Sequence, residues 1–154
     1  MSGIELAFQS VAETPAPARA QVARWLEAAL AGRGLGGELT VRIVDGPESQ
    51  ALNRDYRGRD QPTNVLSFPF EPPPGIPADA AGIIGDLVIC APVVAREAQA
   101  QGKPEIDHWA HMVVHGALHL LGYDHEAQAQ AARMEAEERR ILAGLGVPDP
   151  YQEQ

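Results

Sequence analysis

The sequence predicts one domain that combines about four strands with about five helices, one of them a buried helix that carries most of the histidines. The chain has 154 residues, enough for one domain that buries around two thirds of the surface its unfolded chain exposes. Four stretches have the patterns of strands, and five have apolar residues at helical spacing. No repeat or linker divides the chain, so we expect a single domain over residues 1–154 with a tail at 149–154.

Four segments are predicted to be strands. Residues 4–8 and 39–44 alternate apolar and polar side chains, which is the pattern of a half-buried strand. Residues 63–70 are rich in Val, Leu and Phe and predict a strand, in which Pro69 needs an edge or a terminal position because proline cannot donate a ladder hydrogen bond. Residues 83–90 are mostly apolar and predict a central strand.

Five segments are predicted to be helices because apolar residues recur in them at helical intervals: residues 22–30, 47–56, 93–101, 104–121 and 127–145. Before the second helix, Asp45 and Glu48 have the spacing of a capping box. The fourth helix is apolar over most of its circumference, which predicts burial. In the last helix the run Glu135–Arg140 is expected to be solvated, and residues 71–81 are expected to form an exposed loop.

The composition limits the classes of protein to which the chain can belong. With 12 Lys and Arg against 21 Asp and Glu, the formal net charge is −9, which should repel polyanions unless basic residues gather locally. The single cysteine, Cys90, excludes an intrachain disulfide framework and suits a reducing compartment. We expect no signal peptide and no membrane span, because the first ten residues lack a basic region with a long apolar run and no window has ~18 consecutive apolar residues. We therefore expect a cytoplasmic protein with no membrane partner.

The stretch from His115 to His125, H-G-A-L-H-L-L-G-Y-D-H, carries three histidines at offsets of zero, four and ten. Four residues turn a helix by about 400°, so His115 and His119 should lie one turn apart on one face. Gly122 can end the helix in a left-handed residue, which would swing His125 back toward them. Three converging neutral imidazoles form a catalytic zinc site, so one Zn²⁺ is expected, with hydrogen-bonded core histidines as the structural alternative.

Two more histidines lie on the polar stripe of the same helix. His108 and His111 fall within about 80° of the other two on a helical wheel, and a buried polar stripe is expected to line a cleft because unpaired buried polar groups are costly. Contacts beside the metal and a surface position near the helix start are equally weighted for His108 and His111.

One basic cluster interrupts the acidic chain. It places Arg54, Arg57 and Arg59 within the segment 52–60. On charge pattern alone, the cluster fits a solvated surface turn at least as well as a site for an anion.

Three stretches together resemble the YbeY family of endoribonucleases and rRNA maturation factors: Y-R-G-R-D-Q-P-T-N-V-L-S-F-P-F at 56–70, G-D-L-V-I-C at 85–90, and the histidine motif at 115–125. The resemblance covers nearly the whole chain, including Asp149-Pro150-Tyr151 near its end. It implies an α+β fold in which several helices surround a central one and pack on a mixed four-stranded sheet.

The resemblance also implies a function. His115, His119 and His125 would bind zinc, and Arg57 would be the functionally important arginine of its cluster. Single-stranded RNA is the implied substrate, with roles in 16S rRNA 3′-end maturation and ribosome quality control. The implied partners are the 16S rRNA precursor, the 30S ribosomal subunit and its assembly factors.

These residues suggest how an RNA phosphodiester would be hydrolysed. Neutral ligands leave zinc its full double charge, which can lower the pKa of a bound water toward ~7 and activate it for attack. Arg57 is the expected catalytic side chain, holding a phosphate oxygen in bidentate fashion and stabilising charge in the transition state. Further substrate contacts are expected from Arg59, Asn64, Ser67 and His111.

The general base and two rival functions are left open at this point. Asp124 is the nearest candidate base in sequence, but a position beside His125 suits a supporting role better. A metal-dependent hydrolase of another substrate, such as a peptide, would need an acid where this chain has Gly116. A non-catalytic ribosome-assembly factor stabilised by zinc would use the same surface for binding.

Overall fold

The computed structural model describes residues 3–34, 36–76, 82–124 and 126–151. Along the chain, the elements are β1 (Gly3–Ser10), α1 (Arg19–Leu30), β2 (Gly36–Val44), α2 (Gly46–Arg57), β3 (Val65–Pro69), β4 (Ile83–Cys90), α3 (Ala91–Gln101), α4 (Glu105–Leu120) and α5 (Gln128–Gly144). The four strands and five helices confirm the predicted elements, and the ends differ from the predicted ones by a few residues. None of the helices in the described ranges is long and apolar enough to cross a membrane.

The strands form one mixed sheet in the order β1-β2-β4-β3. β1 pairs with β2, and β2 with β4, in parallel, whereas β3 runs antiparallel to β4. This arrangement confirms the α+β prediction, the central position of β4 and the edge position of the strand that ends at Pro69. Pro69 is the last residue of this edge strand, so it has both of the positions that suit a residue without a ladder donor on its nitrogen.

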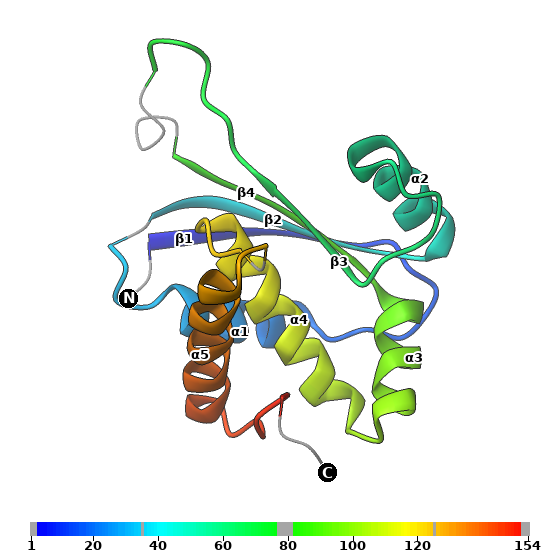
Figure 1. Cartoon of the computed structure of the whole chain (residues 1–154). Coiled ribbons are helices and arrows are strands. Elements are labelled where there is room, and N and C mark those ends of the chain that lie inside the picture. Colours follow the sequence, from blue (N-terminus) through cyan, green and yellow to red (C-terminus); the bar gives the residue numbers. More distant parts are fainter. Residues whose placement is uncertain (1–2, 35, 77–81, 125, 152–154) are drawn as a thin grey trace.

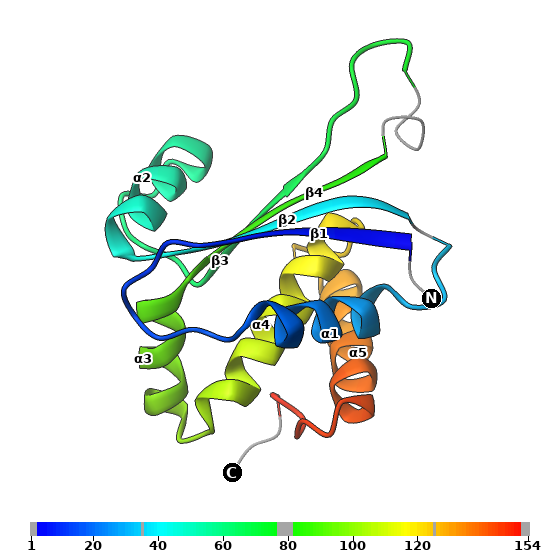
Figure 2. The same cartoon turned by 180° about the vertical axis from the view of Figure 1, so that it is seen from behind.

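The helices divide unequally between the two faces of the sheet. Figures 1 and 2 show α1, α3, α4 and α5 on one face and α2 on the other. The larger core lies under the sheet around α1 and α4 and includes Trp25, Leu39, Ile89, Trp109 and Leu118, which are all buried. A smaller core under α2 contains Val44, Leu66 and Val88.

The central helix α4 is buried over most of its length, as the apolar wheel predicted. It packs closely on the sheet at Gly116, where an added Cβ would lie 3.0 Å from methyl carbons of both Leu87 and Val65. The Ser67 hydroxyl on β3 donates a hydrogen bond of 3.0 Å to the Gly116 carbonyl. After α4, Gly122 has a φ of 97°, which confirms the predicted left-handed reversal.

The predicted capping box before α2 is wrong. The Asp45 side chain does not cap the helix. Its carboxylate accepts hydrogen bonds from the Glu13 backbone N–H at 2.8 Å and from the Thr14 hydroxyl at 3.0 Å. Glu48 instead pairs with Arg42 on β2. Partners from the preceding loop and the adjacent strand thus replace the local bonds that the spacing suggested.

Candidate metal centre

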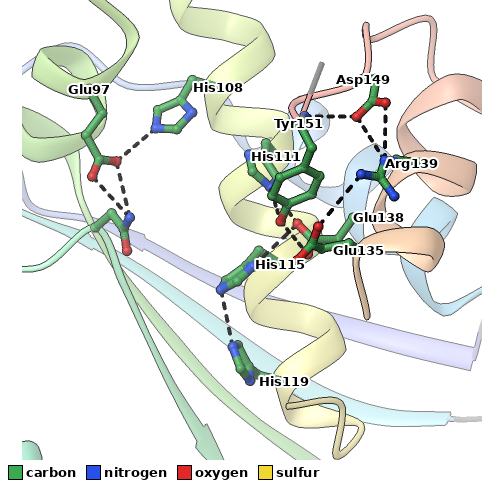
Figure 3. A network of polar contacts seen from close by, with 11 residues as sticks. Glu97, His108, His111, His115, His119, Glu135, Glu138, Arg139, Asp149 and Tyr151 are labelled. Carbon is green, nitrogen blue, oxygen red and sulfur yellow. Dashed lines mark hydrogen bonds and ion pairs between the residues drawn. The ribbon is translucent and has the colours of Figure 1, made fainter. Parts of the chain in front are cut away.

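A line of imidazoles follows α4 from its first turn to its last. Figure 3 shows His108, His111, His115 and His119 in succession on this helix. Ring centroids lie 6.0 Å apart for His108 and His111, 6.0 Å for His111 and His115, and 4.7 Å for His115 and His119. His108 and His111 are buried, so the surface alternative for these two residues is wrong.

His115 and His119 turn their Nε2 atoms toward one another, 3.2 Å apart. On the other side of His119, Nδ1 lies 2.9 Å from the Tyr123 carbonyl oxygen, which can only accept a hydrogen bond. The proton of neutral His119 is therefore on Nδ1, and the Nε2 lone pair is available to a metal. The reversal at Gly122 brings the Tyr123 carbonyl to this position. His125, the third predicted ligand, lies outside the described residues.

A second group of possible ligands lies on the other side of His115. His111, His115 and Glu138 each offer a ligand atom, and these atoms all lie within 4.8 Å of one another. Glu138 Oε2 is 2.5 Å from His111 Nε2 and 3.4 Å from His115 Nδ1. Burial would raise the pKa of Glu138, but the hydrogen bonds from His111 and His115 outweigh burial and hold this pKa at about 2. Burial lowers the pKa of His111. The lowered pKa values of Glu138 and His111 both favour an ionised carboxylate beside a neutral imidazole.

Glu138 corrects the expectation that the run Glu135–Arg140 is solvated, because its side chain is fully buried. It faces α4 from the apolar stripe of α5, between Met134 and Ile141. In the sequence, the signal for a functional role of Glu138 was a carboxylate on an apolar helix stripe, because a buried charge needs partners. The sequence does not show which partners these are, since His111 and His115 belong to another helix.

The segment after α5 also belongs to this network. The Tyr151 hydroxyl donates to Glu138 Oε1 at 2.9 Å, and its ring contacts that of His111 with centroids 5.5 Å apart. Arg139 lies over the Tyr151 ring at 5.2 Å and pairs with Asp149 at 3.2 Å. Residues 149–151 of the predicted tail are thus folded against the site (Figure 3).

Asn64 has a structural partner at the start of β3. Its amide donates to both Glu97 oxygens at 3.2 and 3.3 Å, and Glu97 also contacts His108 Nε2 at 2.9 Å. Burial would raise the pKa of Glu97, but the bonds from His108 and Asn64 outweigh it and lower the pKa. These three residues and Tyr151 line a cavity of about 500 Å³. Glu97, like Glu138, was not identified from the sequence.

The other predicted substrate contacts lie in different environments. Arg57 is the last residue of α2 and is exposed, as is Arg59. No hydrogen bond or ion pair engages the Arg57 side chain within the described ranges, so the structure does not join it to the histidines. Ser67 and His111 are buried and already hydrogen-bonded, to Gly116 and Glu138. Substrate contact by these residues stays a prediction.

The turn that follows Arg57 is held firmly to α2. The Asn53 side chain donates to the Gln61 carbonyl at 2.8 Å, and the Ser49 hydroxyl exchanges hydrogen bonds with the backbone of Thr63 at 3.0 and 3.1 Å. Gly58 closes the helix with a φ of 72°. The exposed guanidinium of Arg57 therefore extends from a well-anchored turn.

Gly116 and Asp124 are the two positions that could have supplied the acidic side chain of a zinc peptidase. A side chain at position 116 would meet Leu87, Val65 and the Ser67 hydroxyl, so an acid there would enter the packing between α4 and the sheet. Asp124 Oδ1 accepts a hydrogen bond from the Glu126 backbone N–H at 3.3 Å, which is a local turn contact. Neither position supplies the glutamate base of a zinc peptidase.

Comparisons with known proteins agree with this architecture. The model of a protein family described as Endoribonuclease YbeY matches residues 7–146. A relative of that name from Halorhodospira halophila is 75% identical over 153 residues, or 99% of each chain. Another of that name, from Alkalilimnicola ehrlichii, is 65% identical over 88% of this chain and 82% of its own. The solution structure of TM1509 from Thermotoga maritima shares the fold, with a TM-score of 0.58 and 20% identity, over 97% of this chain and 100% of that one.

Proposed function

The chain belongs to the YbeY family, and we propose that it is a zinc-dependent endoribonuclease that cuts single-stranded RNA. We place its action in the cytoplasm, in 16S rRNA 3′-end maturation and ribosome quality control. His115, His119 and His125 would hold the ion, and Arg57 would bind the phosphate. The names of the relatives support the nuclease activity, and the geometry on α4 supports the metal.

The pair of Nε2 atoms on α4 is the observation that carries the proposal. Two nitrogen ligands at about 2.05 Å from a tetrahedral zinc are about 3.3 Å apart. The separation between His115 Nε2 and His119 Nε2 is 3.2 Å. Both rings have an acceptor at Nδ1, the Glu138 carboxylate and the Tyr123 carbonyl, so in each neutral ring the lone pair is on Nε2. The donor set therefore fits the ion.

The chain's own residues would bind and orient the RNA. Zinc, when bound, supplies Lewis acidity that activates water and polarises a phosphoryl oxygen. Arg57 would hold a non-bridging oxygen of the scissile phosphate from its anchored turn, and Arg59 would contact a neighbouring phosphate. Because the net charge of −9 weakens binding to free RNA, we propose that the 30S subunit and its assembly factors present the precursor strand.

A cleavage assay with metal analysis tests the proposal. His119→Ala should lose both zinc and cleavage of a defined single-stranded RNA. Arg57→Lys should keep zinc and lose activity by about 10²- to 10³-fold, the range measured when one transition-state donor is removed. Arg24→Lys, the same change at an exposed site on α1, serves as the matched control. The same RNA in duplex form should resist cleavage.

The outcomes separate the proposal from its rivals. A fully active Arg57→Lys protein would remove arginine from the mechanism. Wild-type protein that holds one zinc but cuts no RNA, alone or with 30S subunits, would favour the non-catalytic assembly factor. Accurate cutting of the precursor by purified protein at physiological salt would refute the need for the ribosomal partner.

A further inference from the structure

Glu138 is a buried charge whose cost calls for an explanation. Its side chain is fully buried, and in the described part of the chain its partners are the imidazoles of His111 and His115 and the Tyr151 hydroxyl rather than lysine or arginine. Three donors converge on it: His111 and His115 on Oε2, and the Tyr151 hydroxyl on Oε1. A carboxylate buried for stability alone would be better replaced by an apolar side chain. Its contacts point to a task at the neighbouring imidazoles.

The carboxylate determines which nitrogen of His115 carries the proton. An ionised carboxylate only accepts hydrogen bonds, so the proton of neutral His115 faces Glu138 on Nδ1. The lone pair is then on Nε2, the atom that lies 3.2 Å from His119 Nε2. With the opposite tautomer, an N–H would point at the ligand position and a lone pair would point at the carboxylate.

Glu138 is better suited to orient a ligand than to be one. Its Oε2 forms a short hydrogen bond of 2.5 Å with His111 Nε2, whereas two ligands of one zinc are separated by about 3.3 Å. His111 is buried, and among the described residues its Nδ1 has no hydrogen-bond partner. Placing the His111 proton on Nε2, toward Glu138, therefore avoids a buried N–H without an acceptor.

Residues 149–151 hold Glu138 in this orientation. Tyr151 occupies Oε1 at 2.9 Å and leaves Oε2 to the two histidines. Asp149 accepts a hydrogen bond from the Tyr151 backbone N–H at 2.9 Å, and Arg139 pairs with Asp149 and covers the Tyr151 ring. Figure 3 shows this chain of contacts from Asp149 to His115. The order of the contacts indicates that the end of the chain supports the metal site through Glu138.

We propose that Glu138 is a positioning residue that sets the tautomer and ring orientation of His115 for metal binding, and that Tyr151 holds Glu138 in place. This inference rests on the proposed function, in which His115 and His119 bind the metal. Carboxylates in this position behind a ligating histidine typically account for a 10- to 100-fold effect on metal affinity.

The test measures metal affinity separately from folding and from RNA cleavage. Glu138→Gln, Tyr151→Phe and the control Glu135→Gln, the same change at a surface ion pair of α5, are titrated with Zn²⁺ against a chromophoric chelator. Each is also titrated with Co²⁺, whose visible bands report the ligand set, and each metal-free protein is unfolded thermally. Glu138→Gln should bind one ion about 10- to 100-fold more weakly with unchanged Co²⁺ bands. Tyr151→Phe should weaken binding about 5-fold, the effect of one hydrogen bond.

Four results would overturn the inference. Equal affinities in Glu138→Gln and Glu135→Gln would leave Glu138 with a structural role only, visible as lower stability of the metal-free protein. Altered Co²⁺ bands in Glu138→Gln would make the carboxylate a ligand. If Glu138→Gln does not fold, an unchanged affinity in Tyr151→Phe decides against the inference. Wild-type protein that binds no metal would refute both this inference and the proposed function. If wild-type protein binds metal and cuts RNA, the proposed function stands, and the variants then test the role of Glu138 separately.

Discussion

The close approach of α4 to the sheet at Gly116 should not tolerate even one added methyl group. An alanine Cβ at this position would lie 3.0 Å from Leu87 Cδ2 and Val65 Cγ2 and 3.4 Å from the Ser67 hydroxyl oxygen. The two 3.0 Å contacts are shorter than van der Waals separations, so the Leu87 and Val65 methyl groups would have to give way by a few tenths of an ångström. Gly144 on α5 provides a matched control, because an added Cβ there meets nothing within 4 Å.

The expected magnitude follows from two opposing effects. Over-packing a well-filled core costs about 1–3 kcal/mol. Replacing a helical glycine by alanine gains about 0.5–1 kcal/mol, because the unfolded chain loses conformational freedom. Both variants share that gain, so the free energy of unfolding of Gly116→Ala should lie below that of Gly144→Ala by about 1–3 kcal/mol. For a chain of this size, the difference in Tm is about 2–12 °C.

Denaturant titration of both variants, followed by circular dichroism, measures the difference directly. Fluorescence of the buried Trp109 on α4 should report the same transition. A Gly116→Ala protein that is as stable as Gly144→Ala would show that the side chains of Leu87 and Val65 move aside without a cost in stability. The packing reason for a glycine beside His115 would then be lost.

Two further predictions concern carboxylates away from the proposed metal ligands. The hydrogen bond from Arg140 holds the pKa of Glu137 at about 2, below its ordinary value of 4.5. The stability that this bond supplies is present above about pH 4.5 and is lost as the pH falls toward 2. Glu137→Gln should therefore reduce the acid dependence of the free energy of unfolding by on the order of 1 kcal/mol, and an unchanged pH profile would contradict this. Glu97→Ala should lower the free energy of unfolding at pH 7 by about 1–3 kcal/mol, because it removes the partner of buried His108. The exposed control Glu71→Ala should stay within about 0.5 kcal/mol of wild type, and equal losses in both variants would argue against the role of Glu97.

Local features of the chain were predictable where they depend on backbone periodicity. The offset of four between His115 and His119 requires a shared helix face, and their Nε2 atoms do lie 3.2 Å apart. Pro69 predicted an edge or a terminal position because it lacks a donor, and it is the last residue of the edge strand β3. Gly122 predicted a left-handed reversal, and this reversal places the Tyr123 carbonyl beside His119.

Predictions failed where a side chain finds its partner on a different element. Asp45 and Glu48 have the spacing of a capping box, yet the loop at Glu13 and Thr14 and the strand at Arg42 supply better-placed partners. Because these partners are distant in sequence, the local pattern carries no information about them.

The strands and helices, the central buried helix and the pair of histidines one turn apart could be predicted from the sequence, because these follow from backbone geometry and hydrophobic spacing. The orientation of the imidazoles depends instead on tertiary packing. Glu138 is 23 residues from His115 and is brought to it by the packing of α5 on α4. Tyr151 reaches Glu138 because the segment after α5 folds back against the site. A buried carboxylate must find donors wherever the fold supplies them, and no periodic pattern records which donors those are.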